Sequence, residues 1–214
     1  MPRDAADTRE RLVAAGQRLF AAHGVYSTPL SRIVAEAGQK NASALQYHFA
    51  RGGFDAREGL LFSIINVHND SIEDARRIRL DGLGERPGLR ELVSAVVEPM
   101  AVNLTTAEGR EFLSIISQLV DWFDRWDEGN SPEQALRAFR MIEQALPDGL
   151  SAAIRRERIS RFLEMVSEAL GSRARRVSAD TGSTGVRSPA LDDDDYVANL
   201  IDMAVGALSA IGGR

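Results

Sequence analysis

STPLSRIVAEAGQKNASALQYHF, running from Ser27 to Phe49, is the stretch that decides the fold. Four of its apolar residues recur at three- and four-residue spacing: Leu30, Ile33, Val34 and Ala37. This spacing predicts a short amphipathic helix. Thr28 and Pro29 form a helix-start pattern, in which the threonine hydroxyl caps free amides and proline takes the first helical position. Gly38 is typical of a helix end, because glycine accepts the left-handed conformation found there.

A second short helix is predicted directly after this glycine. Asn41 or Ser43 can cap it, and Leu45 and Phe49, four residues apart, form its inward side. The remaining side chains cannot all point inward with them: Gln46, Tyr47 and His48. The sequence therefore predicts two helices joined by a tight turn, the second presenting polar side chains to its surroundings. This arrangement is typical of helices that lie against nucleic acid.

The run from Thr8 to about Leu61 resembles the DNA-binding region of TetR-type transcriptional regulators. The matching pieces are LFAAHG (Leu19 to Gly24), T-x-x-x-x-I (Thr28 to Ile33), AG (Ala37, Gly38), LQYHF (Leu45 to Phe49) and DAREGLL (Asp55 to Leu61). Two pieces depart from the common pattern. The turn Gln39 to Ser43 is one residue longer than usual, and ARGGF (Ala50 to Phe54) is an insertion after the second helix.

The resemblance implies a set of DNA-contacting residues: Thr28, Arg32, Lys40, Asn41, Ser43, Ala44, Gln46, Tyr47 and His48. By residue match, Thr28, Tyr47 and His48 contact phosphate, with Arg32 nearby. Ser43, Ala44 and Gln46 face the groove. Gln46 is the expected base reader, since a glutamine amide can pair bidentately with adenine.

Composition and charge are compatible with such a protein. The 214 residues are 44% hydrophobic and include no cysteine, which excludes disulfides and zinc–thiolate sites. Met1 leads into a charged segment and no apolar run reaches membrane-spanning length, so we expect a cytoplasmic protein. The net charge is −5, but residues 1–54 hold seven Lys and Arg against four acids, and the remainder holds 19 against 27. A basic head on an acidic body favours nucleic-acid binding by the head.

Helical periodicity continues to the end of the chain without sustained strand alternation. The further predicted helices are Asp55 to Leu80, Pro87 to Leu104, Thr106 to Trp126, Ser131 to Leu146, Leu150 to Val177 and Tyr196 to Ile211. A Ser-, Thr- and Gly-rich loop is predicted over Arg173 to Pro189. We therefore expect an all-α protein of about nine helices. Its predicted domains are a three-helix DNA-binding head, residues 1–54, and a helical ligand-binding and dimerisation body, residues 55–214.

The helix from Thr106 to Trp126 is rich in aromatic residues, which fits either an ordinary core or the lining of a small-molecule cavity. The resemblance implies a cavity among the body helices. The expected lining residues are Phe62, Ile65, Met100, Phe112, Ile116, Leu119, Trp122, Phe123, Trp126, Phe139, Met141, Phe162 and Met165. The expected effector is a small apolar molecule. We interpret the acidic residues Asp121 to Asp127 as a solvated helix face and Asp192 to Asp195 as the start of a helix. No metal or cofactor is therefore expected.

The resemblance also implies a homodimer, formed by pairing the segments 150–177 and 196–211 of two subunits. A dimer would bind a palindromic operator, and effector binding would swing the two heads apart through the helix at Asp55 to Leu80, making the protein a ligand-released repressor. An enzyme is not expected, because three histidines, no cysteine and no G-x-S-x-G motif offer little catalytic machinery. The stronger rival is a helical adaptor that binds only protein.

Overall fold

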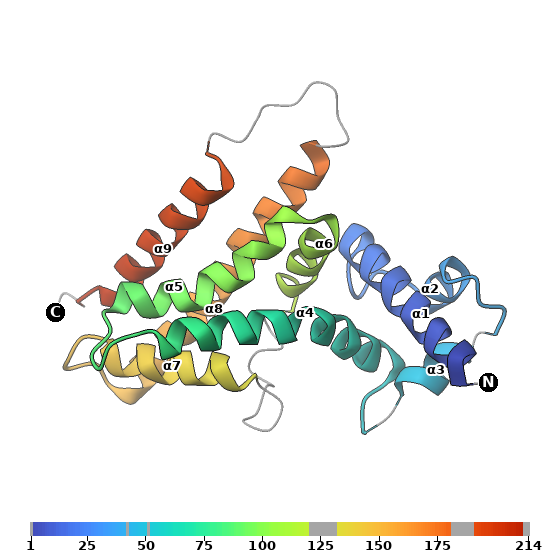
Figure 1. Cartoon of the computed structure of the whole chain (residues 1–214), viewed down its shortest axis with the longest axis horizontal. Helices are drawn as coiled ribbons and strands as arrows, with labels where there is room; N and C mark the ends of the chain where they lie inside the picture. Colours follow the sequence, from blue (N-terminus) through green and yellow to red (C-terminus); the bar gives the residue numbers. More distant parts are fainter. Residues whose placement is uncertain (1, 42, 51, 120–131, 181–190, 212–214) are drawn as a thin grey trace. The chain divides into compact units, whose positions relative to one another are not determined.

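The computed structural model describes residues 2–41, 43–50, 52–119, 132–180 and 191–211 (Figure 1). Over these ranges the chain forms nine α-helices, one 3₁₀ helix and no strand, so the all-α class is confirmed. The chain divides into two compact units, Met1–Asp70 and Ser71–Arg214. They are described separately below. The functional division at residue 54 stays a prediction.

The helices are α1 (Pro2–His23), α2 (Leu30–Glu36), α3 (Ala44–Phe49), α4 (Ala56–Asp81), α5 (Leu89–Ala101), η1 (Val102–Thr105), α6 (Ala107–Ile116), α7 (Glu133–Ala145), α8 (Ala152–Asp180) and α9 (Asp193–Ser209). None of them is long and apolar enough to cross a membrane.

The core of the first unit is built where the apolar faces of α1, α2, α3 and the first half of α4 meet. Its largest fully buried side chains are Leu12, Phe20, Ile33, Leu45, Leu60, Leu61 and Ile64. Gly59 lets α4 approach the end of α3, because a Cβ on Gly59 would stand 2.0 Å from the carbonyl oxygen of Phe49. Asp55 and Glu58 form a reciprocal capping box at the start of α4. The Glu58 carboxylate accepts from the Asp55 amide at 3.0 Å, and the Asp55 carboxylate accepts from the Glu58 amide at 2.9 Å.

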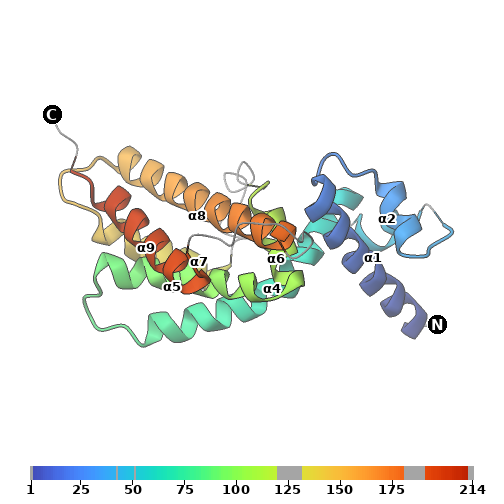
Figure 2. The same cartoon turned by 90° about the horizontal axis from the view of Figure 1, so that it is seen from above.

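The second unit is a bundle in which α6 packs on α8, α9 packs on α5 and α8, and α7 packs on α5 and α8. Figure 2 shows α9 beside α8. Arginines of α8 bind the helix ends beside them: Arg158 donates to the carbonyl oxygens of Leu208 and Ala210. Arg155 donates to the carbonyl oxygen of Glu143, near the end of α7, at 2.7 Å. Such bonds satisfy the free carbonyls at helix C-termini.

Several predicted helix limits are wrong. The sequence predicts a first helix from about Thr8 with Asp7 as its N-cap, but α1 begins at Pro2. α6 ends at Ile116, in a turn, rather than at Trp126. The predicted loop from Arg173 is helical as far as Asp180, because Arg173 and Ala174 are buried on the inner side of α8. Asp192 caps α9 and its first turn holds three acids, as predicted for a helix start.

Candidate nucleic-acid interface

The turn between α2 and α3 is built around Gly38, as predicted. Gly38 has a φ of +68°, a left-handed conformation that favours glycine. The amide of Gln39 donates back to the carbonyl oxygen of Val34 at 3.0 Å, which closes the end of α2. The side-chain oxygen of Asn41 then accepts from the Ser43 amide at 2.9 Å, just before α3 begins. These bonds set the direction in which α3 leaves the turn.

The helix α3 has a buried side and an exposed side. Leu45 and Phe49 are 1% and 4% exposed, so both face the core as predicted. Gln46 and Tyr47 are exposed, with 69% of Tyr47 accessible, and His48 is half-buried. The His48 ring meets Tyr47 edge-on, with ring centroids 5.0 Å apart. The exposed side thus combines an amide, a phenol and an imidazole within one helical turn.

Thr28 and Ala44 are corrections to the predicted set. Thr28 is 1% exposed, and its hydroxyl bonds the carbonyl oxygens of Gly24 at 2.8 Å and Leu19 at 3.2 Å. It therefore closes the end of α1 instead of capping α2, whose N-cap is Pro29 without a side-chain bond. Ala44 is 9% exposed and packs inward. We remove both side chains from the DNA-contacting set, because neither reaches the surface.

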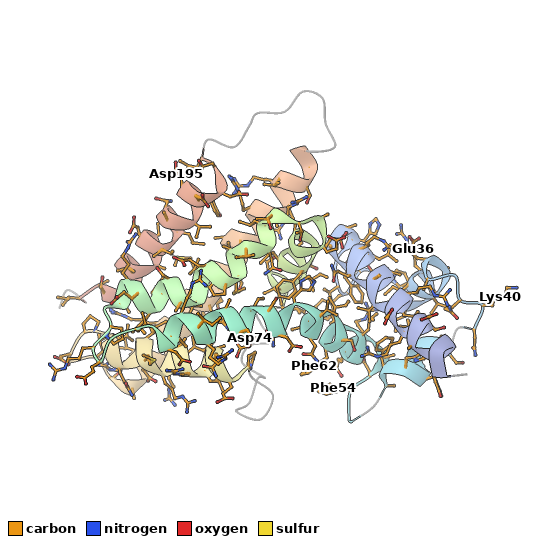
Figure 3. All side chains as sticks on the ribbon, viewed as in Figure 1. Glu36, Lys40, Phe54, Phe62, Asp74 and Asp195 are labelled. Carbon is orange, nitrogen blue, oxygen red and sulfur yellow. The ribbon has the colours of Figure 1, made fainter. Side chains whose placement is uncertain are left out.

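The other predicted residues lie on the surface of the first unit. Arg32 on α2 is exposed, as are Lys40, Asn41 and Ser43 in the turn before α3. Figure 3 shows the Lys40 side chain pointing away from the helices. Exposed cations that flank a polar helix face are what phosphate oxygens require. The structure thus brings the predicted cations and Gln46, Tyr47 and His48 together on the α2–turn–α3 segment.

Two arginines that the sequence did not single out hold this segment in place. Arg9 of α1 donates to the hydroxyl of Ser63 at 2.8 Å, and its guanidinium lies 5.3 Å from the Phe49 ring centroid. Arg57 of α4 donates to the carbonyl oxygen of Thr28 at 3.0 Å and to that of Val25. Spacing could not reveal these contacts, because the partners are distant in sequence and include backbone atoms.

Tyr26 was also missed. It lies in the turn between α1 and α2 and is 61% exposed, whereas its neighbour Val25 is fully buried. An exposed aromatic with a phenolic hydroxyl beside the start of α2 is a further candidate for a phosphate contact. In the sequence, Tyr26 is one of two neighbouring apolar residues in the predicted turn. Nothing in the sequence indicates that Tyr26 and not Val25 is exposed.

The predicted cavity residues are distributed over both units. Phe62 and Ile65 belong to the first unit, where the Phe62 ring stacks on Phe54 with centroids 5.4 Å apart (Figure 3). In the second unit some are buried: Phe112, Ile116, Leu119 and Phe162. Others are half-buried: Met100, Phe139, Met141 and Met165. Trp122, Phe123 and Trp126 lie outside the described residues. The predicted cavity therefore stays a prediction.

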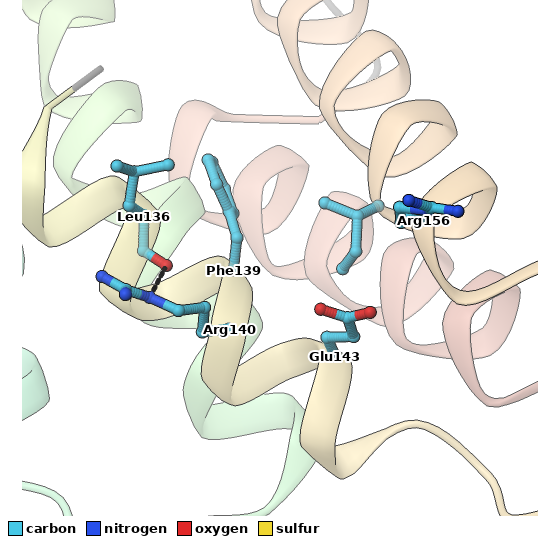
Figure 4. A pocket seen from close by; sticks show the side chains of 6 residues that line it. Leu136, Phe139, Arg140, Glu143 and Arg156 are labelled. Carbon is cyan, nitrogen blue, oxygen red and sulfur yellow. Dashed lines mark hydrogen bonds between the residues drawn. The ribbon is translucent and has the colours of Figure 1, made fainter. Parts of the chain in front are cut away.

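Two open pockets lie on the second unit. One, of about 170 Å³, lies between α7 and α8 and includes Phe139 from the predicted set, with Arg140 and Arg156 beside it (Figure 4). The other, of about 460 Å³, lies between the end of α4, α5, η1 and α9, and its lining includes Arg79, Glu98 and Asp193. Among the described residues no group of three or more potential ligands could hold a metal ion.

The predicted dimer helices need one correction. Leu200 and Ile201 belong to the segment 196–211 that was expected to form the subunit interface, but each is 3% exposed because α9 packs on α5 and α8 of the same chain. The free side of α9 carries Met203, 56% exposed, one turn before Gly206. At Gly206 an added Cβ would meet no atom within 4 Å. Leu200 and Ile201 therefore do not lie on the exposed side of α9.

Comparison of the whole chain with solved structures identifies its fold. A protein of Shewanella sp. PV-4 described as a tetR family transcription regulator matches with a TM-score of 0.53 at 12% sequence identity, covering 95% of this chain and 99% of that one. The transcriptional regulatory protein RHA5900 matches with a TM-score of 0.51 at 17% identity, covering 95% and 100%. No family model and no curated protein sequence matches the chain. The resemblance inferred from the sequence is confirmed at the level of the fold.

Proposed function

We propose that this chain is a transcriptional regulator that binds a palindromic DNA operator as a homodimer, with α3 as the helix that enters the major groove. The observation that carries the proposal is the division of α3 into a buried apolar side and an exposed side with Gln46 and Tyr47. An exposed amide is ordinary, but Tyr47 leaves 69% of an aromatic side chain in water, which suits a residue that contacts a partner. The shared fold of the two solved regulators supports the same function.

Phosphate binding and base reading fall to different residues in this proposal. The exposed cations Arg32 and Lys40 and the hydroxyl of Tyr47 bind the DNA backbone, which supplies affinity without sequence preference. Gln46 reads one base edge through its amide. A single short helix covers only a few base pairs. Sequence selectivity therefore requires two subunits, whose α3 helices lie roughly 34–36 Å apart, one turn of DNA.

The dimer interface in this proposal is formed by α8 and α9. The free side of α9, around Met203 and Gly206, offers an apolar side chain beside small residues that permit close approach. The body binds a small-molecule effector, and effector binding favours a dimer in which the two α3 helices no longer match the operator spacing. An effector can shift this equilibrium only through different affinities for the two states.

The test is an unbiased selection of bound duplexes from a random pool with the full-length protein at about physiological salt, where sequence-independent binding is weak. We expect an enriched motif with two inverted half-sites whose centres are one helical turn apart. The matched control is Gln46→Ala, which should lose the preference at one position in each half-site. Retention without an enriched motif, vanishing as salt rises, would instead favour the helical adaptor.

A further inference from the structure

Arg76 is a buried cation in the second unit, on the inner face of α4. It stands between Ile72 and Leu80, one turn away on either side, and the three residues are 3%, 4% and 2% exposed respectively. An arginine on such a stripe has exchanged water for an apolar interior, a transfer that is costly unless the guanidinium is paired and hydrogen-bonded. The hydrogen-bond acceptors of this guanidinium therefore have to be identified.

The pairing of Arg76 within the chain is incomplete. One terminal nitrogen, Nη1, donates to the Glu73 carboxylate, one turn earlier on α4. The Nε atom is buried and has no hydrogen-bond partner among the described residues. Arginine carries five N–H donors in a planar fork. Buried donors are almost always satisfied, so an unsatisfied one indicates a missing acceptor.

Glu73 is not free to serve Arg76 alone. Its second carboxylate oxygen accepts from the backbone amide of Gln134 at 2.7 Å, in the first turn of α7. One carboxylate thus faces both a guanidinium and the positive end of a helix dipole. Burial lowers the pKa of Arg76 from its ordinary value, and the charge of Glu73 only opposes this effect. The single negative charge of Glu73 is therefore shared between the Arg76 guanidinium and the start of α7.

We propose that Arg76 binds the carboxylate of a small molecule whose remainder is apolar. This rests on the proposed function, in which that molecule is the effector. A carboxylate can take two N–H donors of a guanidinium side by side, and such charged bonds are the stronger ones. A monoanion suits the small excess of positive charge better than a phosphate dianion. The buried neighbours Ile72 and Leu80 favour an apolar remainder. This replaces the purely apolar effector expected from the sequence.

The same acceptor chemistry could come from the chain itself, because Asp121, Asp124 and Asp127 lie in a segment outside the described residues. The two sources predict different behaviour. A bound small molecule leaves Arg76 available to added carboxylate. An internal carboxylate would make added carboxylate ineffective, and replacing the three aspartates by asparagine would then lower the melting temperature of the unliganded protein.

The experiment measures binding of octanoate to the full-length protein by calorimetry and by the shift in melting temperature. The matched probes are 2-octanone, which offers a neutral oxygen, and inorganic phosphate, which offers an anion without an apolar chain. We expect octanoate to bind and to raise the melting temperature with its concentration, since a ligand of the folded state stabilises it by mass action. Both matched probes should bind at least about tenfold more weakly, because bonds to charged groups are the stronger ones.

Variants test whether Arg76 is the anchor. Arg76→Gln should weaken octanoate binding by about tenfold or more, and Arg76→Lys should weaken it less, since lysine keeps the charge but not the planar fork. Glu73→Gln should strengthen binding, because it removes a competing negative charge, whereas a purely structural pair would show no such gain. Arg77→Gln is the control, as Arg77 is half exposed and pairs with Asp74 on the surface. If Arg76→Gln does not fold, octanoate binding by Arg76→Lys and Glu73→Gln tests the role of Arg76 instead.

The proposal is overturned if octanoate fails to bind the wild-type protein, if 2-octanone binds equally well, or if octanoate binds the Arg76 variants and the Glu73 variant unchanged. Its failure is separable from that of the proposed function. Selective DNA binding without carboxylate binding would remove only the Arg76 site. Carboxylate binding that depends on Arg76, in a protein that selects no DNA motif, would keep the site and remove the regulator.

Discussion

Gln46 and Tyr47 are adjacent on α3 and both exposed, yet they offer DNA different chemistry. An amide presents a donor and an acceptor in one plane, which can match a base edge, whereas a phenol presents a single hydroxyl suited to a phosphate oxygen. The half-buried His48 packs edge-on against the Tyr47 ring, and in the proposed complex it contributes a second phosphate contact. These roles make distinct predictions.

We expect Gln46→Ala to cost about 1–3 kcal/mol on the best operator and little on unrelated DNA, because only a base contact discriminates between sequences. Tyr47→Ala and His48→Ala should weaken binding to both kinds of DNA by similar factors. Equilibrium titration of selected and unrelated duplexes measures the difference. Equal losses on both duplexes for all three variants would contradict the assignment of Gln46.

Gly59 makes a second prediction at this scale. An alanine Cβ there would collide with the Phe49 carbonyl at the end of α3, so α4 and α3 must separate. We expect Gly59→Ala to lower the free energy of unfolding by about 1–3 kcal/mol, as overpacking does, and to weaken DNA binding. Gly84→Ala, where an added Cβ meets nothing within 4 Å, is the control and should change neither. Denaturant unfolding measures the effect. An unchanged midpoint for Gly59→Ala would contradict the close packing of α3 on α4.

Among the predicted DNA-contacting residues, the sequence correctly separated Leu45 and Phe49 from Gln46 and Tyr47, because helical spacing determines which side chains share a face. It could not place Thr28. A threonine before a proline can cap the next helix or close the previous one, and the difference depends on the path of the turn from Gly24. Arg57 was unpredictable for a related reason, since it binds backbone carbonyls about thirty positions earlier.

At the scale of the element, one side of α9 packs on α5 and α8 of its own chain and the other side is exposed. Leu200→Glu places a charge in the protomer core, so we expect it to reduce helical circular dichroism and the melting temperature. Met203→Glu places a charge on the exposed side, so we expect a folded protein that sediments as a monomer and binds operator weakly. Sedimentation at micromolar concentration measures both. A wild-type monomer, or an undiminished Met203→Glu dimer, would contradict an interface on this side.

We expect the contact between α8 and α9 to be sensitive to alkali. The Tyr196 hydroxyl donates to the Ala169 carbonyl oxygen at 2.7 Å, and burial raises the pKa of Tyr196 above its ordinary value. A raised pKa means that the folded state favours the neutral phenol. This stabilisation is complete below the unfolded pKa of about 10 and is lost as pH rises through the folded value.

We therefore expect the melting temperature of the wild-type protein to fall more steeply above about pH 10 than that of Tyr196→Phe, which has no phenol to ionise. At neutral pH the variant should lose only about 1 kcal/mol, the value of one hydrogen bond. Thermal unfolding between pH 7 and pH 11 measures both effects. Parallel curves for the two proteins would contradict the role of the half-buried phenol.

Helix limits were harder to predict than helix existence. The apolar stripe of α8 was visible in sequence, but its last turns were assigned to a loop because the chain from Arg173 to Pro189 is rich in Ser, Thr and Gly. In the fold Arg173 is buried against α9: its Nε donates to Asp193 at 2.8 Å, and its guanidinium lies over the Tyr196 ring at 4.9 Å. Such a tertiary pair turns a polar residue into part of the core, and no local pattern contains that information.

For the molecule as a whole, the all-α class and the fold shared with the two solved proteins were predictable because apolar residues recur at helical spacing and the head has a specific order of motifs. The chemistry of the effector was not. The aromatic residues near Trp126 suggested an apolar ligand, whereas the incomplete pairing of Arg76 favours a carboxylate. The sequence shows an arginine one helical turn after a glutamate, and this is most often a surface pair. Only the burial of Arg76 distinguishes it.

The most direct test of the central claim is the ratio of dissociation constants for the selected operator and for a shuffled duplex of equal length, measured with the wild-type protein at about physiological salt. We predict at least about a thousandfold preference for the operator, the lower range of specific DNA-binding proteins, and two subunits bound per operator. Equal dissociation constants for the two duplexes, weakening together as salt rises, would show that α3 reads no sequence and would contradict the account.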